Sequence, residues 1–555
     1  MPTGAELFVS ALDNLGIREI FTLVGDHLND ALIEAARRAF RLFDFRHESG
    51  AAHAAEVWAR LHRRPALALV TGGPGHTNAL TGIATAQLAG SPLLAVSGAI
   101  ATGSRGRQGF QEIDQVACAQ PLVKWAGQPA SGAEIPRMLE LACREALSGR
   151  MGAVHLTIPV DLFSAPVDRP PPLPRPCRPE ASPPHPPDVE RALSLLRSAQ
   201  RPVVIAGSGV WWAHAEAELR QFAERTSLPV YTVTLARGTL PDDHALAMGY
   251  ADPALNRAAA AAFHQADVVL VLGKRVDYRL ALGGPRLFSP EAQFIQVDIH
   301  APELGKNRPV AVGLCADVRE TLRAFLQALG RERWPQRPWL EQLRQLDRHW
   351  REQLDQLARD EGTPLHPAAV FRTLRELLPR DVLYAWDGGD FTHWGRAMLP
   401  ALQPGGWVRL GPLGAIGASL PNATALQLAN PGKRVVALTG DGALGFYLAE
   451  LDTLVRLGLP VIIVVGNDAG WGLERELQRE LHPGLPTVAC ELRPTRYDLI
   501  MKGFGGEGEN VDTLRELAGA IARALASEKP YLVNVNIRGV RSPFTEWQIE
   551  AKRER

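Results

Sequence analysis

The stretch VVALTGDGALGFYLAELDTLVRLGLPVIIVVGNDAGWG, from Val435 to Gly472, decides the expected fold. Two apolar, β-branched runs stand on either side of a helix-like segment, and each run is followed by an Asp among glycine or other small residues. Strands that alternate with helices in this way indicate a parallel sheet, in which the turns after the strands lie at one edge. We therefore expect Asp441 and Asp468 to share that edge.

The same alternation of apolar strand, small-residue turn and amphipathic helix recurs along the chain, for example in PALALVTGGPGHTNALTGIATAQLAG and RPVVIAGSGVWWAHAEAELRQF. It predicts an α/β protein with three doubly wound parallel-sheet domains. The proline-rich stretch APVDRPPPLPRPCRPEASPPHPPDVE is typical of a linker. The expected parts are an N-terminal domain (1–165), the linker (166–190), a central domain (191–350), a C-terminal domain (363–540) and a tail or lid (541–555).

The overall composition excludes several classes of protein. The chain has 555 residues, is 46% hydrophobic and carries 60 basic and 60 acidic residues, so no global field favours nucleic acid or an anionic membrane. No apolar run reaches the roughly 18–20 residues of a membrane span, and the N-terminus lacks the pattern of a signal peptide. The five cysteines show no metal-ligand spacing. We expect a cytoplasmic protein with small-molecule partners.

The segment TGDGA, from Thr439 to Ala443, is a candidate phosphate site. Glycines at 440 and 442 allow the backbone to approach a phosphate, and Asp441 can ligate a divalent cation. A structural Gly-Asp-Gly turn is the alternative. Carboxylates of Asp441 and Asp468, a carbonyl near Gly470 and two diphosphate oxygens would supply most of the octahedral shell of Mg²⁺.

This pattern resembles the diphosphate-binding motif of thiamine diphosphate (ThDP) enzymes, and the resemblance covers nearly all the chain. Such enzymes have a pyrimidine-binding, a central and a diphosphate-binding domain in that order. The segment LGAIGASLP is similar to the one that holds a bulky apolar residue under the bent cofactor, and WDGGD is similar to a second diphosphate loop. Besides Asp441 and Asp468, the resemblance implies these cofactor contacts: Pro74, Gly388, Gly389, Asp390, Gly414, Ile416, Gly440, Gly442, Ala443, Gly470 and Trp471.

The resemblance also implies an early glutamate that contacts the pyrimidine ring, and FDFRHESGAAHAAEVWARL supplies Glu48 at a strand end before a helix. Its carboxyl group would stabilise the imino tautomer, whose nitrogen takes the proton from the thiazolium carbon. The alternative is a glutamate that the helix dipole favours in a first turn.

Within the superfamily, the chain most resembles the group of acetolactate synthase, benzaldehyde lyase and 2-hydroxyacyl-CoA lyase. GDHLNDAL places His27, and GFQEIDQ places Gln111, on the active-site histidine and glutamine of benzaldehyde lyase. Both would move protons at substrate oxygens. Asp26 departs from that enzyme, and a buried carboxylate there would oppose an anionic 2-keto acid or donate a proton if protonated. A structural role for His27 is the alternative.

The central domain resembles those that carry ADP in 2-hydroxyacyl-CoA lyase and oxalyl-CoA decarboxylase, with Asp298 at a strand end. The alternatives are a working ADP or CoA site and a vestigial FAD site. The segment RGVRSPFTEWQIEAKRER would be a lid over the active site or a disordered tail.

We thus expect a ThDP- and Mg²⁺-dependent carbon–carbon lyase or carboligase acting on 2-hydroxy ketones, 2-keto acids or 2-hydroxyacyl-CoA. The resemblance implies a homodimer or homotetramer with active sites at the subunit interface. Acetolactate synthase and a simple 2-keto acid decarboxylase remain alternatives, as does a non-catalytic binding protein with the ThDP fold.

Overall fold

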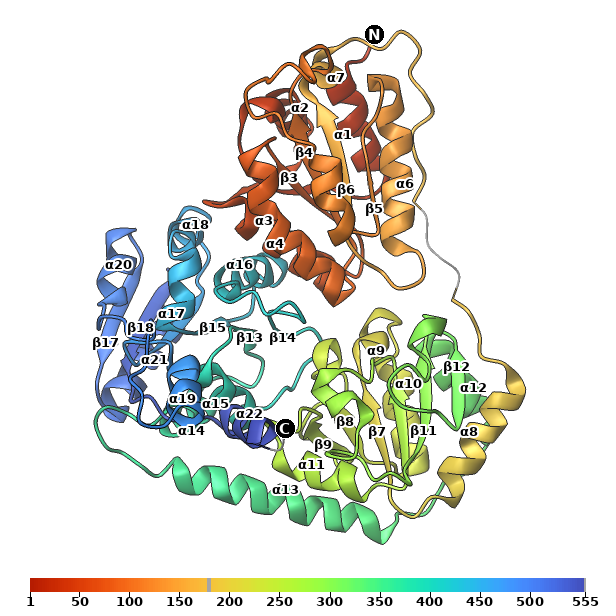
Figure 1. The fold of residues 1–555 in the computed structure, drawn as a ribbon, viewed down its shortest axis with the longest axis vertical. Coiled ribbons are helices and arrows are strands. Elements are labelled where there is room, and N and C mark those ends of the chain that lie inside the picture. The colour runs from red at the N-terminus through yellow and green to blue at the C-terminus, as the bar shows by residue number, and fades with distance from the viewer. Residues whose placement is uncertain (177–180, 554–555) are drawn as a thin grey trace. The chain divides into compact units, whose positions relative to one another are not determined.

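The structure is a computed structural model that describes residues 1–176 and 181–553. These residues form three six-stranded parallel sheets (Figure 1). Every strand pair in these sheets is parallel, and helices connect successive strands. The predicted α/β class with three doubly wound parallel sheets is therefore confirmed. Four residues of the predicted linker (177–180) and the last two of the predicted tail (554–555) lie outside the described residues.

The N-terminal sheet has the strand order β2-β1-β3-β4-β6-β5. Its strands are β1 (Glu19–Leu23), β2 (Arg41–Asp44), β3 (Ala66–Val70), β4 (Leu93–Ala99), β5 (Trp125–Gly127) and β6 (Val154–Pro159). Its helices are α1 (Gly4–Asn14), α2 (Asn29–Arg37), α3 (Glu48–His62), α4 (Pro74–Ala89), α5 (Gln115–Ala119), α6 (Ile135–Leu147) and α7 (Val160–Ser164).

The central sheet has the order β12-β11-β10-β7-β8-β9. Its strands are β7 (Pro202–Ala206), β8 (Val230–Thr232), β9 (Ala247–Tyr250), β10 (Val268–Leu272), β11 (Gln293–Asp298) and β12 (Val312–Cys315). The helices in this part of the chain are α8 (Pro186–Ser198), α9 (Ser208–Trp212), α10 (Glu216–Thr226), α11 (Arg257–Gln265), α12 (Val318–Leu329) and α13 (Pro338–Leu357). The run VVLVL of β10 is wholly buried, as expected of a strand covered on both faces.

The C-terminal sheet, β14-β13-β15-β16-β18-β17, repeats the order of the N-terminal one. Its strands are β13 (Leu383–Trp386), β14 (Trp407–Val408), β15 (Val435–Gly440), β16 (Ile462–Asn467), β17 (Glu507–Val511) and β18 (Tyr531–Asn536). The helices are α14 (Pro367–Leu377), α15 (Asp390–Met398), α16 (Ser419–Ala429), α17 (Asp441–Leu444), α18 (Glu450–Arg456), α19 (Gly472–Leu481), α20 (Tyr497–Gly503), α21 (Leu514–Ala526) and α22 (Pro543–Arg553).

The segment between β15 and β16 is not one helix. The short α17 passes through a 3-10 turn (Gly445–Tyr447) into α18. Glycines at 442 and 445 disfavour a continuous helix here, because glycine loses the most conformational freedom on becoming helical.

The chain forms two compact units. The first comprises residues 1–179, 410–432 and 445–461, and the second comprises 180–409, 433–444 and 462–555. In the first unit, α16 packs against α3. The segments 410–432 and 445–461 thus group with the N-terminal sheet although they fall within the predicted C-terminal domain. The domain boundaries themselves stay a prediction.

Candidate active site

In the N-terminal sheet, β1 and β3 are neighbours: the chain continues from β1 to β2 on one side and from β3 to β4 on the other. Open α/β sheets bind ligands at such a switch point in the strand order. His27, after β1, is 7% exposed. Its Nδ1 accepts a hydrogen bond from the Gly72 backbone N–H at 3.2 Å and lies 3.0 Å from the Thr71 Oγ1. Burial lowers the pKa of His27, which Asp26 partly opposes. The neutral ring therefore carries its proton on Nε2.

Two glutamines from the segment after β4 reach the same turn. Gln115 accepts from the Gly73 backbone N–H at 2.9 Å and donates to the Gly98 carbonyl at 3.0 Å. Gln111 lies beside Gly73: a Cβ added to Gly73 would lie only 2.7 Å from the Cβ of Gln111. Both residues have a positive φ, +66° at Gln111 and +60° at Gly73. The structure thus brings Gln111 to the turn near His27, while the buried and doubly bonded Gln115 holds that turn in place.

Glu48 begins α3 and is 7% exposed. The Asn78 side chain, on α4, donates to its Oε2 at 2.9 Å. A Cβ on Gly75 would lie 3.3 Å from its Oε1, so the glycine leaves room beside that oxygen. Asn78 therefore orients the carboxyl group and leaves Oε1 facing the small residue.

Two predicted residues of this edge lie at the surface of the chain. Asp26 and Pro74 are both exposed. The buried carboxylate considered at Asp26 is therefore not what the structure shows, because the residue stands on the outer side of the turn before His27.

In the second unit, β13 and β15 form the corresponding switch point. Asp441, directly after β15, is 2% exposed and accepts from the Gly470 backbone N–H at 3.1 Å. Burial and the neighbouring Asp468 raise the pKa of Asp441 to about 7. The structure thus brings together Asp441, Asp468 and Gly470, as the sequence predicts.

Asp468 follows β16 and forms an ion pair with Arg475 of α19. Burial raises the pKa of Asp468, while the Arg475 charge opposes that rise. Arg475 also lies 3.3 Å from Glu491. The guanidinium therefore holds the Asp468 carboxylate from one side and would compete with a cation for it.

The glycines of the predicted diphosphate site leave space for a ligand. A Cβ on Gly440 would meet its first neighbour at 4.0 Å, and one on Gly389, at a φ of +89°, would meet nothing within 4 Å. By contrast, a Cβ on Gly442 would lie 2.8 Å from the Trp471 ring. Gly442 is thus required by packing against Trp471, and the buried Ala443 follows it in α17.

Asp390, at the start of α15, lies against the C-terminal segment rather than open to the site. Its Oδ1 accepts hydrogen bonds from the hydroxyl groups of Ser542 and Thr545. Burial raises the pKa of Asp390 to about 6, with the two hydroxyl groups opposing. The predicted tail therefore includes a helix, α22, that is tied to α15.

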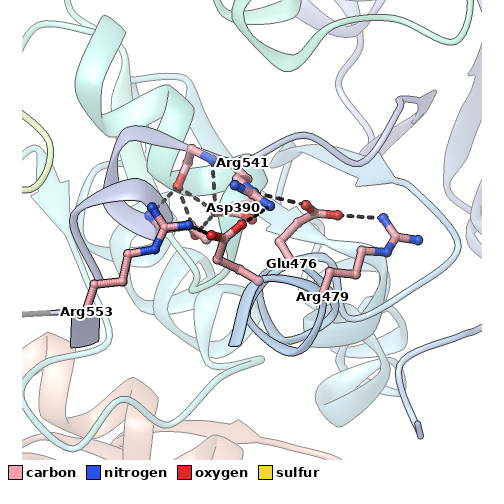
Figure 2. Close-up of polar contacts among 8 residues, drawn as sticks. Asp390, Glu476, Arg479, Arg541 and Arg553 are labelled. Carbon is pink, nitrogen blue, oxygen red and sulfur yellow. Dashed lines mark hydrogen bonds and ion pairs between the residues drawn. The ribbon is translucent and has the colours of Figure 1, made fainter. Parts of the chain in front are cut away.

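Figure 2 shows the ion pairs that hold this segment to α19. Arg541 lies 3.2 Å from Glu476 and 2.8 Å from Glu480. Arg479, on α19 itself, lies 2.7 Å from Glu476 and orients that carboxylate. Arg553 pairs with Glu480. Exposed pairs contribute little each, but together they orient α22.

Gly414 and Ile416 lie in residues 410–432 of the first unit, and Ile416 is partly buried. Gly414 has a φ of +74° with no atom within 4 Å of an added Cβ. The loop is open enough for a ligand to approach its backbone.

The residues present fit a magnesium ion that shares its ligands with a diphosphate. Asp441 and Asp468 supply the hard oxygen donors that Mg²⁺ prefers. Among the described residues, no group of three or more His, Cys, Asp or Glu side chains could hold a metal ion alone. Oxygens of a second molecule are therefore needed to complete the shell.

In the central sheet the switch point lies between β7 and β10. The side chain of Lys274, shortly after β10, is buried there against Gly207, where a ligand would otherwise bind. Lys274 is 3% exposed, donates to the Arg275 carbonyl at 2.6 Å and lies 2.7 Å from the Asp277 carboxylate. A Cβ on Gly207 would lie 2.4 Å from its Cβ. Asp298 ends β11, as predicted, and caps the following turn through the His300 N–H at 2.9 Å.

Three family models match the chain. They are the thiamine pyrophosphate enzyme N-terminal TPP binding domain over residues 2–118, the central domain over 189–325 and the C-terminal TPP binding domain over 387–535. The chain therefore belongs to the thiamine pyrophosphate enzyme family and is a ThDP-dependent enzyme. The resemblance that the sequence motifs indicate is confirmed.

Similar proteins cover almost the whole chain. A protein named probable acetolactate synthase from Mycobacterium bovis is 38% identical over 531 residues, which is 95% of this chain and 94% of the relative. The human 2-hydroxyacyl-CoA lyase 1 is 31% identical over 552 residues, 96% of this chain and 94% of the relative. Oxalyl-CoA decarboxylase from Escherichia coli is 30% identical over 557 residues, which is 97% of this chain and 95% of the relative.

The motifs did not single out several residues that the structure places at these edges. The amide group of Asn78 donates to Glu48, and the amide oxygen of Gln115 accepts from the Gly73 N–H. In both pairs the partner is distant in sequence. Glu450, on α18, is 1% exposed and accepts from the Arg46 N–H, and burial raises the pKa of Glu450 to about 7. No local sequence signal marks these residues, because their partners lie far away in the chain.

No helix in the described part of the chain combines the length and hydropathy needed to cross a membrane.

Proposed function

We propose that this enzyme makes or breaks a carbon–carbon bond next to a carbonyl group, with ThDP and Mg²⁺ as cofactors. The observation that carries the proposal is the placement of acidic groups in two sheets of identical strand order. Glu48 is oriented by Asn78 in the first unit, and Asp441 lies beside Asp468 in the second. A protein that only binds the cofactor would not need the oriented carboxyl group of Glu48.

Bound ThDP supplies a nucleophilic carbon that adds to a substrate carbonyl and stabilises the electron pair left after bond cleavage. Glu48 would hold a proton at the pyrimidine ring through the oxygen that faces Gly75. A carboxyl group in a buried site keeps its hydrogen bond when water is excluded.

His27 is proposed to donate its Nε2 proton to a substrate oxygen, because Gly72 and Thr71 already occupy Nδ1. Gln111, which lies beside Gly73, would orient the same oxygen, and Asp26 would lie at the outer rim. These three residues and Glu48 are the proposed catalytic set.

Asp441, Asp468 and the carbonyl of Gly470 are the proposed magnesium ligands. The cation would replace Arg475 as the partner of Asp468 or share the carboxylate with it. The proposed cofactor contacts otherwise remain Pro74, Gly388, Gly389, Asp390, Gly414, Ile416, Gly440, Gly442, Ala443 and Trp471.

The proposed substrates are 2-hydroxy ketones, 2-keto acids or 2-hydroxyacyl-CoA, because the relatives bear the names of a synthase, a lyase and a decarboxylase. Acetolactate synthase is the second candidate, since the mycobacterial relative with that name is 38% identical. For the central domain, we propose a vestigial nucleotide site, because the buried Lys274 fills the switch point.

We further propose a homodimer or homotetramer with active sites at the subunit interface, a cytoplasmic location and the domain division at 1–165, 166–190, 191–350, 363–540 and 541–555. These follow from the family resemblance, the composition and the proline-rich linker.

Product analysis tests the proposal. The enzyme with ThDP and Mg²⁺ is given pyruvate, benzoin or a 2-hydroxyacyl-CoA separately, and products are identified by mass spectrometry with Glu48→Gln as the control. Acetolactate would identify a synthase, benzaldehyde a hydroxyketone lyase, and an aldehyde with formyl-CoA a CoA lyase. No product from any of the three, with ThDP demonstrably bound, would contradict these three activities, direct the search to other 2-keto acid donors and favour the non-catalytic alternative.

A further inference from the structure

A cluster of arginines lies within the second unit, away from the proposed magnesium ligands. Arg279 lies in the 3-10 segment Tyr278–Gly283, Arg396 in α15 and Arg409 directly after β14. They meet Tyr250, at the end of β9, and Asp252. This gathering joins the central and the C-terminal sheets inside one compact unit.

Two of the three arginines have polar partners. Arg279 lies 2.8 Å from the Asp252 carboxylate, and Arg409 donates to the Tyr250 hydroxyl at 2.9 Å. Arg396 differs: it is 3% exposed, and its Nε and Nη1 have no hydrogen-bond partner among the described residues. No ion pair of that part of the chain includes Arg396.

The surroundings of Arg396 make its positive charge unfavourable. Burial and the nearby Arg409 lower the pKa of Arg396 to about 9, so the guanidinium is still charged at neutral pH. Burial and Arg396 also lower the pKa of His393 well below its usual range, and the His393 Nδ1 lacks a partner in the described chain. A buried guanidinium with unused donors requires an acceptor.

A small cavity adjoins this guanidinium. Its volume is about 40 Å³. Its charged walls are Arg237, Asp242, Asp347, Arg351 and Arg396, and Tyr250 and Asn256 add polar groups. Arg237 pairs with Asp242 and Arg351 with Asp347, so these four charges cancel in pairs. Arg396 therefore leaves the wall with an excess positive charge. Arg351 is 51% exposed, which puts that side of the cavity next to solvent.

The volume limits what can enter. A cavity of this size holds about three water molecules, or one carboxylate group. It is too small for the diphosphate of a nucleotide or of coenzyme A. Planar guanidinium groups bind carboxylates through paired N–H donors.

We propose that the cavity beside Arg396 binds a small carboxylate, as a free anion or as the carboxylate end of a larger molecule. The bound group would lie against the Arg396 side chain, which lines the cavity, and would neutralise the excess charge. Because Arg396 lies six residues after Asp390 on α15, the anion would fix this helix to the central sheet. The proposal goes beyond the proposed function and does not depend on it.

Isothermal titration calorimetry of the full-length enzyme, with ThDP and Mg²⁺ present, tests the site with sodium formate at constant ionic strength. We expect saturable binding of one formate per chain, and a loss of affinity of about tenfold or more in Arg396→Met. Arg323→Met, which removes an exposed arginine paired with Glu218, serves as the control and should bind formate as the unmodified enzyme does. Pyruvate as a second titrant separates the sources: binding that persists in Glu48→Gln and is lost in Arg396→Met supports the cavity as its site.

Three results would overturn the proposal. One is the absence of saturable formate binding to the unmodified enzyme up to about 100 mM. Another is unchanged binding in Arg396→Met. Equal competition by chloride would overturn the assignment to a carboxylate. If Arg396→Met does not fold, Arg396→Lys keeps the charge but loses the planar donors, and unaltered affinity in that variant would count against the site.

Discussion

The carboxylate of Asp390 accepts a hydrogen bond from the Ser542 hydroxyl at 2.5 Å, and this bond joins the start of α15 to the segment that leads into α22. The two residues are 152 positions apart. The Asp390 carboxylate also lies close enough to Asp468 for their charges to interact. The docking of the C-terminal helix is therefore coupled to the edge where we propose the diphosphate and magnesium.

Removing this bond should loosen α22. We expect Ser542→Ala to lower the stability of the docked helix by about 1–2 kcal/mol, because one hydrogen bond to a buried charge is lost. Hydrogen exchange of residues 543–553 should speed up several-fold, while that of β16 should not change. Ser527→Ala, at the C-terminal end of α21, is the matched control, because it removes a serine hydrogen bond away from α22. Unaltered hydrogen exchange of α22 would mean that the ion pairs to α19 keep the helix docked without the Ser542 hydrogen bond.

Docking of α22 should also depend on pH. The folded pKa of Asp390, about 6, is above that of an unfolded Asp, so the folded state binds the proton more tightly. The contribution of Asp390 is then most favourable below about pH 4 and declines as the pH rises towards 6. Exchange of α22 measured at pH 5 and pH 7, corrected for intrinsic rates, should be slower at pH 5, and Asp390→Asn should remove the difference.

Glu48→Gln should lower turnover by at least about a hundredfold, because the amide cannot accept and return the proton. Affinity for ThDP should change by less than about threefold, since Asn78 can still bond the side chain. Fluorescence titration with ThDP and steady-state kinetics check both quantities. An equal loss of ThDP affinity and turnover would mean that Glu48 has a structural role and not a catalytic one.

His27→Gln should reduce kcat by about 10²-fold or more while leaving ThDP affinity nearly unchanged. The glutamine can still accept from Gly72 but offers no proton from the Nε2 position. The pH dependence of kcat should lose one ionisation in this variant. A parallel fall in cofactor binding would contradict the proton-transfer role.

Magnesium binding should weaken in acid. Since the folded pKa of Asp441 is about 7, protons compete with the cation below that pH. We expect the half-saturating Mg²⁺ concentration, at fixed ThDP, to be about tenfold higher at pH 6 than above pH 8. Ca²⁺, which also binds oxygen ligands, should follow the same trend. A constant value between pH 6 and 8 would show that Asp441 is not a ligand.

Three buried histidines, on α3, α4 and β6, predict acid sensitivity. Burial lowers the pKa of His53 and His76 to about 4 and that of His155 to about 3. Because the unfolded residues titrate near 6.5, stability is complete above that pH and is lost as the pH falls towards 4. His155→Gln should reduce this loss by a few kcal/mol at pH 4, as measured by denaturant unfolding. The exposed His264 is the control position.

Much of the fold was predictable because it is encoded by local pattern. The apolar runs before Asp441 and Asp468 become neighbouring strands, and Glu48 begins a helix after a strand, as predicted. The assignment of the glycines at 389 and 440 to a phosphate loop stays a prediction, although the space beside both glycines is compatible with it. The exposure of Asp26 and the break after α17 could not be foreseen, since both depend on how a turn packs.

The sequence by itself determined the family, the parallel sheets and the positions of the acidic residues at strand ends, because these depend on short-range periodicity and on motifs within a few dozen residues. Only the tertiary structure decided which polar groups meet. Asn78 reaches Glu48, Ser542 reaches Asp390, and Arg396 is buried without a carboxylate partner. Such pairings join residues far apart in the chain, and their energies depend on burial and distance, which no local pattern records.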